Sequence, residues 1–196
     1  MTVRKEMKVH DGLFFVTMTC YDWLNLFDIT NGYDFVYKQF DVLKNEGHFI
    51  NGYVIMPNHL HALIAFMNKV QSVNDRLGAM KRFMAYDIIN QLKKQNNFDV
   101  LEELRMGVNW TDLKKGKIHE VFEPSFDCKE CYSIDFIQQK LDYMHDNPCK
   151  EKWNLVQNPI DYIHSSARLY ETGEQGIYPI MNYHELIDLD ESRWKL

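Results

Sequence analysis

The sequence predicts an α+β fold, a ferredoxin-like split β-α-β antiparallel sheet with helices on one face and an added C-terminal helix. Three observations support this. Strand-like and helix-like segments follow one another in the order β-α-β-β-α-β-α. Two helical segments intervene among four strand segments, as in the split β-α-β arrangement. A Pro-Asn turn alone separates the second and third strands, which predicts a hairpin.

The first two elements follow from residue type and spacing. Leu13 to Cys20 is rich in aromatic and β-branched residues, which favours a strand. From Asn31 to Glu46, apolar residues recur at positions 33, 36, 37, 40 and 43, which is a helical spacing. Gly47 then provides a stop signal for this helix.

The hairpin and a long helix come next. We expect strands over Phe49–Met56 and His59–Phe66, on either side of the turn at Pro57-Asn58. The segment Ser72–Gln95 predicts a long helix. Its inward-facing residues are expected to be Leu77, Met80, Met84, Ile88 and Leu92.

The last two elements complete the pattern. Lys117–Glu123 is expected to be the fourth strand, ended by Pro124. Ser133 can cap a helix that runs to about Asn147, where Pro148 stops it. This is the added C-terminal helix, and it carries a tyrosine that is considered below.

Length and composition indicate a folded protein with one main domain. The chain has 196 residues, of which 45% are apolar and 26% charged. We expect a domain over residues 1–170 and an acidic appendage over 171–196. Apolar runs are far shorter than the roughly 20 residues of a membrane span, and the N-terminus lacks the apolar core of a signal peptide. A cytoplasmic location without a membrane partner is therefore expected.

The four cysteines give little indication of a metal site. Without an export signal, reduced thiols are expected at Cys20, Cys128, Cys131 and Cys149. Cys128 and Cys131 form a lone C-x-x-C pair, and a structural zinc site would need a second such pair or two histidines. We interpret them as two thiols in a turn.

Charge is distributed unevenly along the chain. The formal net charge is −6, which argues weakly against nucleic acid as a partner. Residues 51–117, however, carry ten basic and six acidic side chains, whereas residues 171–196 carry two basic and six acidic ones. A solvated helix face would explain the basic centre equally well. The side chains that could follow phosphates are Arg76, Lys81, Arg82, Lys114, Lys115 and Lys117.

A pair of histidines marks a candidate metal site. Side chains alternate along a strand, so His59 and His61 face the same side, with Cα atoms about 6.5–7 Å apart. Two imidazoles at that spacing can share one cation. The simpler alternative is two surface histidines on an exposed strand face.

A tyrosine and an asparagine form a second candidate group. Tyr143 and Asn147 are separated by four residues, so they lie on one face of the expected helix. An amide oxygen can bind a metal, and a phenol beside that metal could attack a phosphodiester. A free phenol, with a pKa of about 10, needs a base for this, and the sequence does not identify one. Alternatively, Tyr143 packs as an ordinary helix residue and Asn147 only ends the helix.

At these residues the sequence resembles a known family. The segments that carry the resemblance are Gly52-Tyr-Val-Ile-Met-Pro-Asn-His-Leu-His-Ala-Leu-Ile64, Lys140-Leu-Asp-Tyr-Met-His-Asp-Asn-Pro148 and Asp161-Tyr-Ile-His-Ser-Ser-Ala-Arg168. In this order they are similar to the motifs of single-tyrosine HUH transposases, particularly those associated with repetitive extragenic palindromes. The sequence departs from the family at Cys149, at Trp153–Val156 and at His164.

The resemblance implies a transposase that cuts and joins single-stranded DNA through a 5′-phosphotyrosine intermediate. By the family pattern, Tyr143 is the nucleophile, and His59, His61 and Asn147 bind Mg²⁺ or Mn²⁺. The implied partner is single-stranded DNA with hairpin or palindromic structure. A homodimer and a monomer are both compatible with the sequence.

Two alternatives belong to other functional classes. One is a domesticated DNA-binding module of the same fold that lacks transposition activity. The other is a different metal or nucleotide enzyme that uses the same histidine pair. Histidine-triad hydrolases need a third alternating histidine, and position 63 is Leu63, so that particular family is excluded.

Overall fold

The computed structural model describes residues 11–67, 71–124, 127–189 and 194. The strands are β1 (Gly12–Thr19), β2 (Phe49–Met56), β3 (His59–Phe66) and β4 (Asp127–Glu130). The α-helices are α1 (Leu26–Ile29), α2 (Tyr33–Asn45), α3 (Val73–Lys94), α4 (Phe98–Met106), α5 (Trp110–Lys114), α6 (Ile134–His145), α7 (Ala167–Thr172) and α8 (Tyr183–Leu189). Short 3₁₀ turns are η1 (Tyr21–Trp23), η2 (Asn147–Cys149) and η3 (Pro159–Asp161).

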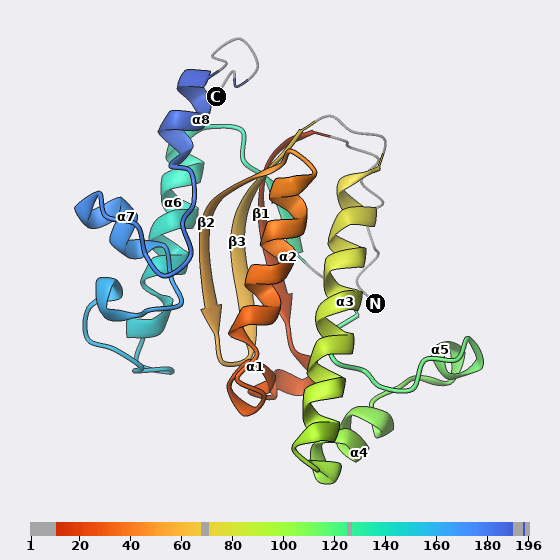
Figure 1. Cartoon of the computed structure of the whole chain (residues 1–196). Helices are drawn as coiled ribbons and strands as arrows, with labels where there is room; N and C mark the ends of the chain where they lie inside the picture. The colour runs from red at the N-terminus through yellow and green to blue at the C-terminus, as the bar shows by residue number, and fades with distance from the viewer. Residues whose placement is uncertain (1–10, 68–70, 125–126, 190–193, 195–196) are drawn as a thin grey trace.

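The sheet has the topology expected from the sequence. Its strand order is β2-β3-β1-β4, and every neighbouring pair is antiparallel. Helices α2 and α3 cover one face, and α6 lies on the other side of the sheet (Figure 1). The predicted α+β, ferredoxin-like arrangement is therefore confirmed, with the added helix on the face opposite α2 and α3.

The face under α2 and α3 holds the larger core. All five residues predicted to point inward from α3 are buried. The alternate residues of β3 that begin at Leu60 belong to the same cluster. Ser72 caps α3 by accepting a hydrogen bond from the Asp75 backbone N–H, so the helix begins where the sequence indicates.

The opposite face is covered by α6. Ile137, Leu141 and Met144 pack over Leu13, Phe15 and Leu63 in a second cluster of buried apolar residues. Gly52 lies where α6 approaches β2 closely, since a Cβ there would be 2.8 Å from Cδ2 of Leu141. Ser133 caps the helix through the Phe136 backbone N–H, as predicted.

The predicted position of the fourth strand is wrong. Lys117–Glu123 is not a strand; its Phe122 makes one isolated bridge to Cys20, beyond the end of β1. Val121 and Phe122 turn into the core instead. The edge of β1 is occupied by the polar segment Asp127–Glu130, which lies after Pro124. A short polar edge strand has no alternating apolar pattern, which explains why the sequence did not indicate it.

Two further regions, for which the sequence predicted no elements, are structured. Helices α4 and α5 occupy the connection after α3. In the region expected to be an appendage, Tyr178 and Ile180 belong to the first core cluster, and Tyr183 and Leu186 to the second. The proposed division at residue 170 stays a prediction.

Candidate active site

The two histidines of β3 lie on the α6 side of the sheet. Both His59 and His61 are buried, while the intervening Leu60 lies in the core on the opposite side. Their ring centres are 4.8 Å apart. The same-face prediction is confirmed, and the alternative of two histidines on an exposed strand face is wrong.

The β2–β3 turn fixes the orientation of the first histidine. Nδ1–H of His59 donates to Oδ1 of Asn58 at 2.8 Å, which leaves the Nε2 lone pair free to accept. The same Asn58 amide donates from Nδ2 to the carbonyl of Trp23 at 3.1 Å. The backbone carbonyl of Asn58 also accepts from the N–H of Cys20 at 2.8 Å. A buried amide thus ties the imidazole to the turn that follows β1.

The second histidine is supported from β1. Thr17 lies opposite His61 in the antiparallel pair, and its Oγ1 is 2.8 Å from Nδ1 of that ring. Phe15 stacks on the same ring, with centres 5.3 Å apart. Among the described residues, no group hydrogen-bonds to the buried Nε2 of His61. A buried nitrogen without a partner is unfavourable unless a ligand satisfies it.

Both imidazoles are held neutral. Burial, together with the smaller effects of the nearby Lys152 and Lys150, lowers the pKa of His59 to about 4. Burial also lowers the pKa of His61, as do His59, Lys150 and Lys140. Neutral imidazoles at pH 7 have lone pairs available for a cation.

The end of α6 completes the group. Nδ2 of Asn147 donates to Nε2 of His59 at 2.9 Å. The ring of Tyr143 lies 5.3 Å from that of His61 and 6.3 Å from that of Phe15. Tyr143 remains 47% exposed, so its side chain is accessible from solvent although its ring packs against these two neighbours. All four predicted residues come together within one chain.

A hydrogen-bond network anchors the tyrosine helix to the sheet. Nε2 of His145 lies 2.9 Å from Oγ of Ser166, which accepts the backbone N–H of Tyr53 at 2.9 Å. The backbone N–H of Ser166 in turn donates to the carbonyl of Tyr53. Neither His145 nor Ser166 was predicted from the sequence as a supporting residue; the Ser-Ser pair of the third motif was the available signal.

Lysines surround the exposed phenol. Nζ of Lys150 lies 3.9 Å from the centre of the Tyr143 ring and donates to the Tyr143 carbonyl at 3.2 Å. Nζ of Lys140 lies 5.9 Å from the same ring. These cations make the mouth of the site attractive to an anion such as a phosphodiester. Neither lysine was predicted from the sequence as a site residue.

The donor set fits a divalent ion. Within the described ranges, no group of three or more His, Cys, Asp or Glu side chains could hold a metal. The candidate set is instead two neutral imidazoles and one amide, and it includes the buried Nε2 of His61, which has no hydrogen-bond partner among the described residues. Imidazole and amide ligands suit transition ions such as Mn²⁺, and amide oxygen suits Mg²⁺.

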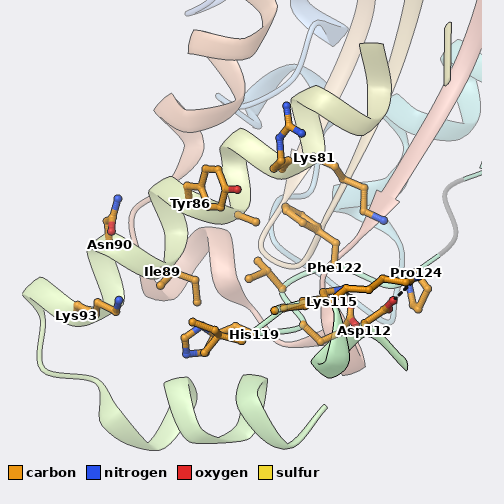
Figure 2. Close-up of a pocket in the computed structure, with 17 residues that line it drawn as sticks. Lys81, Tyr86, Ile89, Asn90, Lys93, Asp112, Lys115, His119, Phe122 and Pro124 are labelled. Atoms are coloured by element: carbon orange, nitrogen blue, oxygen red, sulfur yellow. Dashed lines mark hydrogen bonds and ion pairs between the residues drawn. The ribbon is translucent and has the colours of Figure 1, made fainter. Parts of the chain in front are cut away.

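Four of the six basic residues predicted to follow phosphates line one cavity. The α3 cavity, of about 820 Å³, lies between α3 and residues 112–124 (Figure 2). Lys81, Arg82, Lys115 and Lys117 line it, together with Lys93. Asp112 and Glu120 also line it and pair with Lys115 and Lys117. The remaining excess of positive charge makes the cavity basic in an acidic protein.

The other two basic residues lie elsewhere. Arg76 is largely buried and pairs with Glu46, so it helps to join α3 to α2. Lys114 lies over the ring of Trp110 on α5, with Nζ 4.6 Å from its centre. Among the described thiols, Cys128 and Cys131 form no disulfide.

The fold and the gathered side chains define a ferredoxin-like α+β protein with a tyrosine helix over a His-Leu-His strand. A solved structure of a REP-associated tyrosine transposase bound to a REP hairpin is similar, with a TM-score of 0.62 and 17% identity over 93% of each chain. A protein provisionally classed as a transposase from Deinococcus radiodurans R1 gives a TM-score of 0.42 and 13% identity, covering 70% of this chain and 92% of that one.

The first likeness establishes the fold and agrees with the resemblance carried by the sequence motifs. No protein-family model matches the chain, and no curated protein matches it. In the part of the chain that is described, no helix is both long enough and apolar enough to cross a membrane.

Proposed function

We propose that the protein is a metal-dependent endonuclease and strand transferase for single-stranded DNA, that is, a transposase. One observation carries the proposal: the hydrogen bond from Asn147 to His59 joins the tyrosine helix to the histidine strand. It leaves Tyr143 exposed at the edge of a buried donor set. A buried ligand group beside an accessible phenol suits cleavage by attack on phosphorus.

The chain's own residues would divide the chemistry between them. The hydroxyl oxygen of Tyr143 attacks phosphorus, the new O–P bond forms, and the P–O3′ bond breaks. The phenol loses its proton and the departing 3′ oxygen gains one. Lys150 would hold a phosphate oxygen near the phenol by a charge-assisted hydrogen bond. The 5′-phosphotyrosine link conserves the energy of the phosphodiester, so rejoining requires no nucleotide cofactor.

The ligands proposed for the metal are Nε2 of His59, Nε2 of His61 and the amide oxygen of Asn147. Mg²⁺ or Mn²⁺ bound there would polarise the phosphodiester and stabilise the charge that develops on it. Asn58 and Thr17 would keep both imidazoles oriented, because each engages the ring nitrogen that does not face the ion.

The proposed substrate is a single strand that folds into a hairpin. The similar solved structure is of a transposase bound to such a hairpin, and the α3 cavity here is basic. Its Arg82, Lys93 and Lys115 would contact phosphates and so contribute affinity without reading sequence. Because the four site residues meet within one chain, we propose that the tyrosine acts in cis.

The test is covalent capture of DNA. The protein is incubated with labelled single strands that contain palindromes from the DNA flanking its own gene, with Mn²⁺ or with EDTA. A labelled band that resists denaturation and requires Mn²⁺ is expected. Tight hairpin binding without any adduct would instead identify a DNA-binding module. A tightly bound zinc without DNA activity would favour an unrelated metal enzyme.

A further inference from the structure

We infer that Trp23 and Trp153 form a stacking platform for an unpaired DNA base next to the histidine pair. This inference rests on the proposed function for the identity of its ligand. The two indole rings lie 6.2 Å apart, and each also contacts the ring of His59, with centres at 5.6 and 5.4 Å. The platform therefore adjoins the place where the scissile phosphate would lie.

Exposure and charge suit the platform to a nucleotide. Trp23 is 51% exposed although it is large and apolar, and Trp153 is half-buried beside it. Nζ of Lys152 lies 4.6 Å from the centre of each indole ring. Aromatic faces bind bases of any sequence, and a neighbouring ammonium can hold the phosphate attached to them. Paired bases stack within a duplex, so the ligand is an unpaired base.

Trp23 lies in a strained stretch of backbone that keeps its side chain exposed. Asp22 and Trp23 both adopt left-handed conformations, with φ of 47° and 57°, which residues other than glycine rarely do. The backbone N–H of Asp22 is held by Oε1 of Glu123, and the carbonyl of Trp23 by Asn58. Strain that the surrounding structure maintains is found most often at functional sites.

One amide links the platform to the histidines. Asn58 accepts from Nδ1 of His59 and donates to the carbonyl of Trp23, so the same side chain orients both groups. A base stacked on the indole rings would thus be held at a fixed position relative to the proposed metal ligands. We expect the platform to position the nucleotide beside the bond that is cut.

The experiment measures binding apart from chemistry. In a Tyr143→Phe background, an oligonucleotide of about six nucleotides, at the short end of known site sizes, is titrated by fluorescence anisotropy. Trp23→Gly is the key variant because glycine adopts a positive φ freely, so the melting temperature is expected to hold. Trp153→Ala is the second variant, which covers the case in which the first does not fold.

The matched control is Trp110→Ala. Trp110 is 69% exposed and also carries a lysine over its ring, but it lies on α5. We expect Trp23→Gly and Trp153→Ala to weaken binding about tenfold to 100-fold, the range that one stacked base contributes, and Trp110→Ala to leave it unchanged. An abasic site is also placed at each position of the oligonucleotide in turn. At one position it should weaken binding by a similar factor, and in Trp23→Gly an abasic site at that position should cause no further loss of affinity.

Each outcome separates the platform from the proposed chemistry. Equal affinities for all variants and all abasic positions would overturn the platform while leaving covalent capture by Tyr143 intact. If the protein with Tyr143 intact forms no adduct, but an abasic site at one position still weakens binding, the platform stands and the proposed cleavage is wrong. Equal weakening by Trp110→Ala would show general aromatic binding and would also overturn the platform.

Discussion

The amide nitrogen of Asn147 donates to Nε2 of His59 over 2.9 Å, although 88 residues separate the two in the chain. The contact bridges η2, which follows directly after α6, and the first residue of β3. In the proposed enzyme an ion would replace this hydrogen bond: the amide of Asn147 would rotate to present its oxygen, and Nε2 of His59 already presents its lone pair. The proposed ligands already lie close together in this structure, so α6 need not move far for them to bind an ion.

The nucleophile can be tested by removing a single oxygen. Tyr143→Phe should abolish the covalent adduct, because it removes the hydroxyl that the proposal places beside the histidines. The free energy of unfolding should change by less than about 0.5 kcal/mol, since the side chain is half exposed. Gel analysis after denaturation measures the adduct, and a gel shift checks that hairpin binding is retained. The exposed Tyr132→Phe serves as control, and adduct formation by Tyr143→Phe would refute the assignment.

The metal ligands can be tested by direct binding. Losing a residue that only hydrogen-bonds to a metal ligand typically weakens metal binding roughly 10–100-fold. Because His59 is proposed as a ligand itself, His59→Gln should weaken Mn²⁺ binding by more than this. Calorimetric titration with Mn²⁺ gives the affinity without any need for DNA. His184→Gln removes an exposed histidine and should have no effect. Equal Mn²⁺ affinities in all three proteins would place the ion elsewhere.

The role of Lys150 predicts a rate effect that depends on charge. Lys150→Met removes the ammonium 3.9 Å from the Tyr143 ring centre and should slow adduct formation about tenfold to 100-fold. Lys150→Arg should restore much of the rate, because it retains a positive donor. Single-turnover kinetics at saturating DNA separate this effect from weakened binding. Lys129→Met, at an exposed position on β4, is the matched control, and an unchanged rate in Lys150→Met would exclude a role in the reaction.

A partly buried histidine outside the candidate active site predicts acid sensitivity. Nδ1 of His164 lies within hydrogen-bond distance of the hydroxyl of Tyr37, at 3.0 Å, and its ring stacks on Tyr33. Burial lowers the pKa of His164, only partly opposed by Asp34. The unfolded chain therefore binds this proton more readily, so stability present at neutral pH is lost as the pH falls below about 6.5.

His164→Gln keeps an acceptor for Tyr37 but cannot titrate in this range. The variant should show a shallower loss of stability between neutral pH and about pH 5, measured by urea unfolding without metal. Some dependence should remain, because burial also lowers the pKa values of His59 and His145. A slope identical to that of the original protein would show that His164 contributes nothing.

The elements predicted correctly are those in which apolar residues recur at a regular spacing along the sequence. Alternation placed His59 and His61 on one face, and helical spacing identified the buried side of α3. The fourth strand was misplaced because Val121 and Phe122 are apolar for reasons of core packing, whereas β4 is short and polar. Edge strands of that kind are defined by their neighbour rather than by their own sequence.

The candidate site was predicted only in part, for a similar reason. Its central residues lie in two short motifs, so spacing and resemblance were enough to find them. Lys150 and Trp23 reach the site from loops far apart in sequence, and no local pattern distinguishes them from solvated residues. The support from Ser166 depends on the packing of α6 against β2, which only the folded chain defines.

The hairpin that carries the histidines has one further consequence. Met56 pairs with His59, so only Pro57 and Asn58 connect β2 to β3. Because side chains alternate, a single residue inserted here that shifted the register of β3 by one would send both imidazoles into the apolar layer beneath α2 and α3. A deletion of one residue would do the same. For the proposed activity, the length of this loop is thus as strict a requirement as the identity of the histidines themselves.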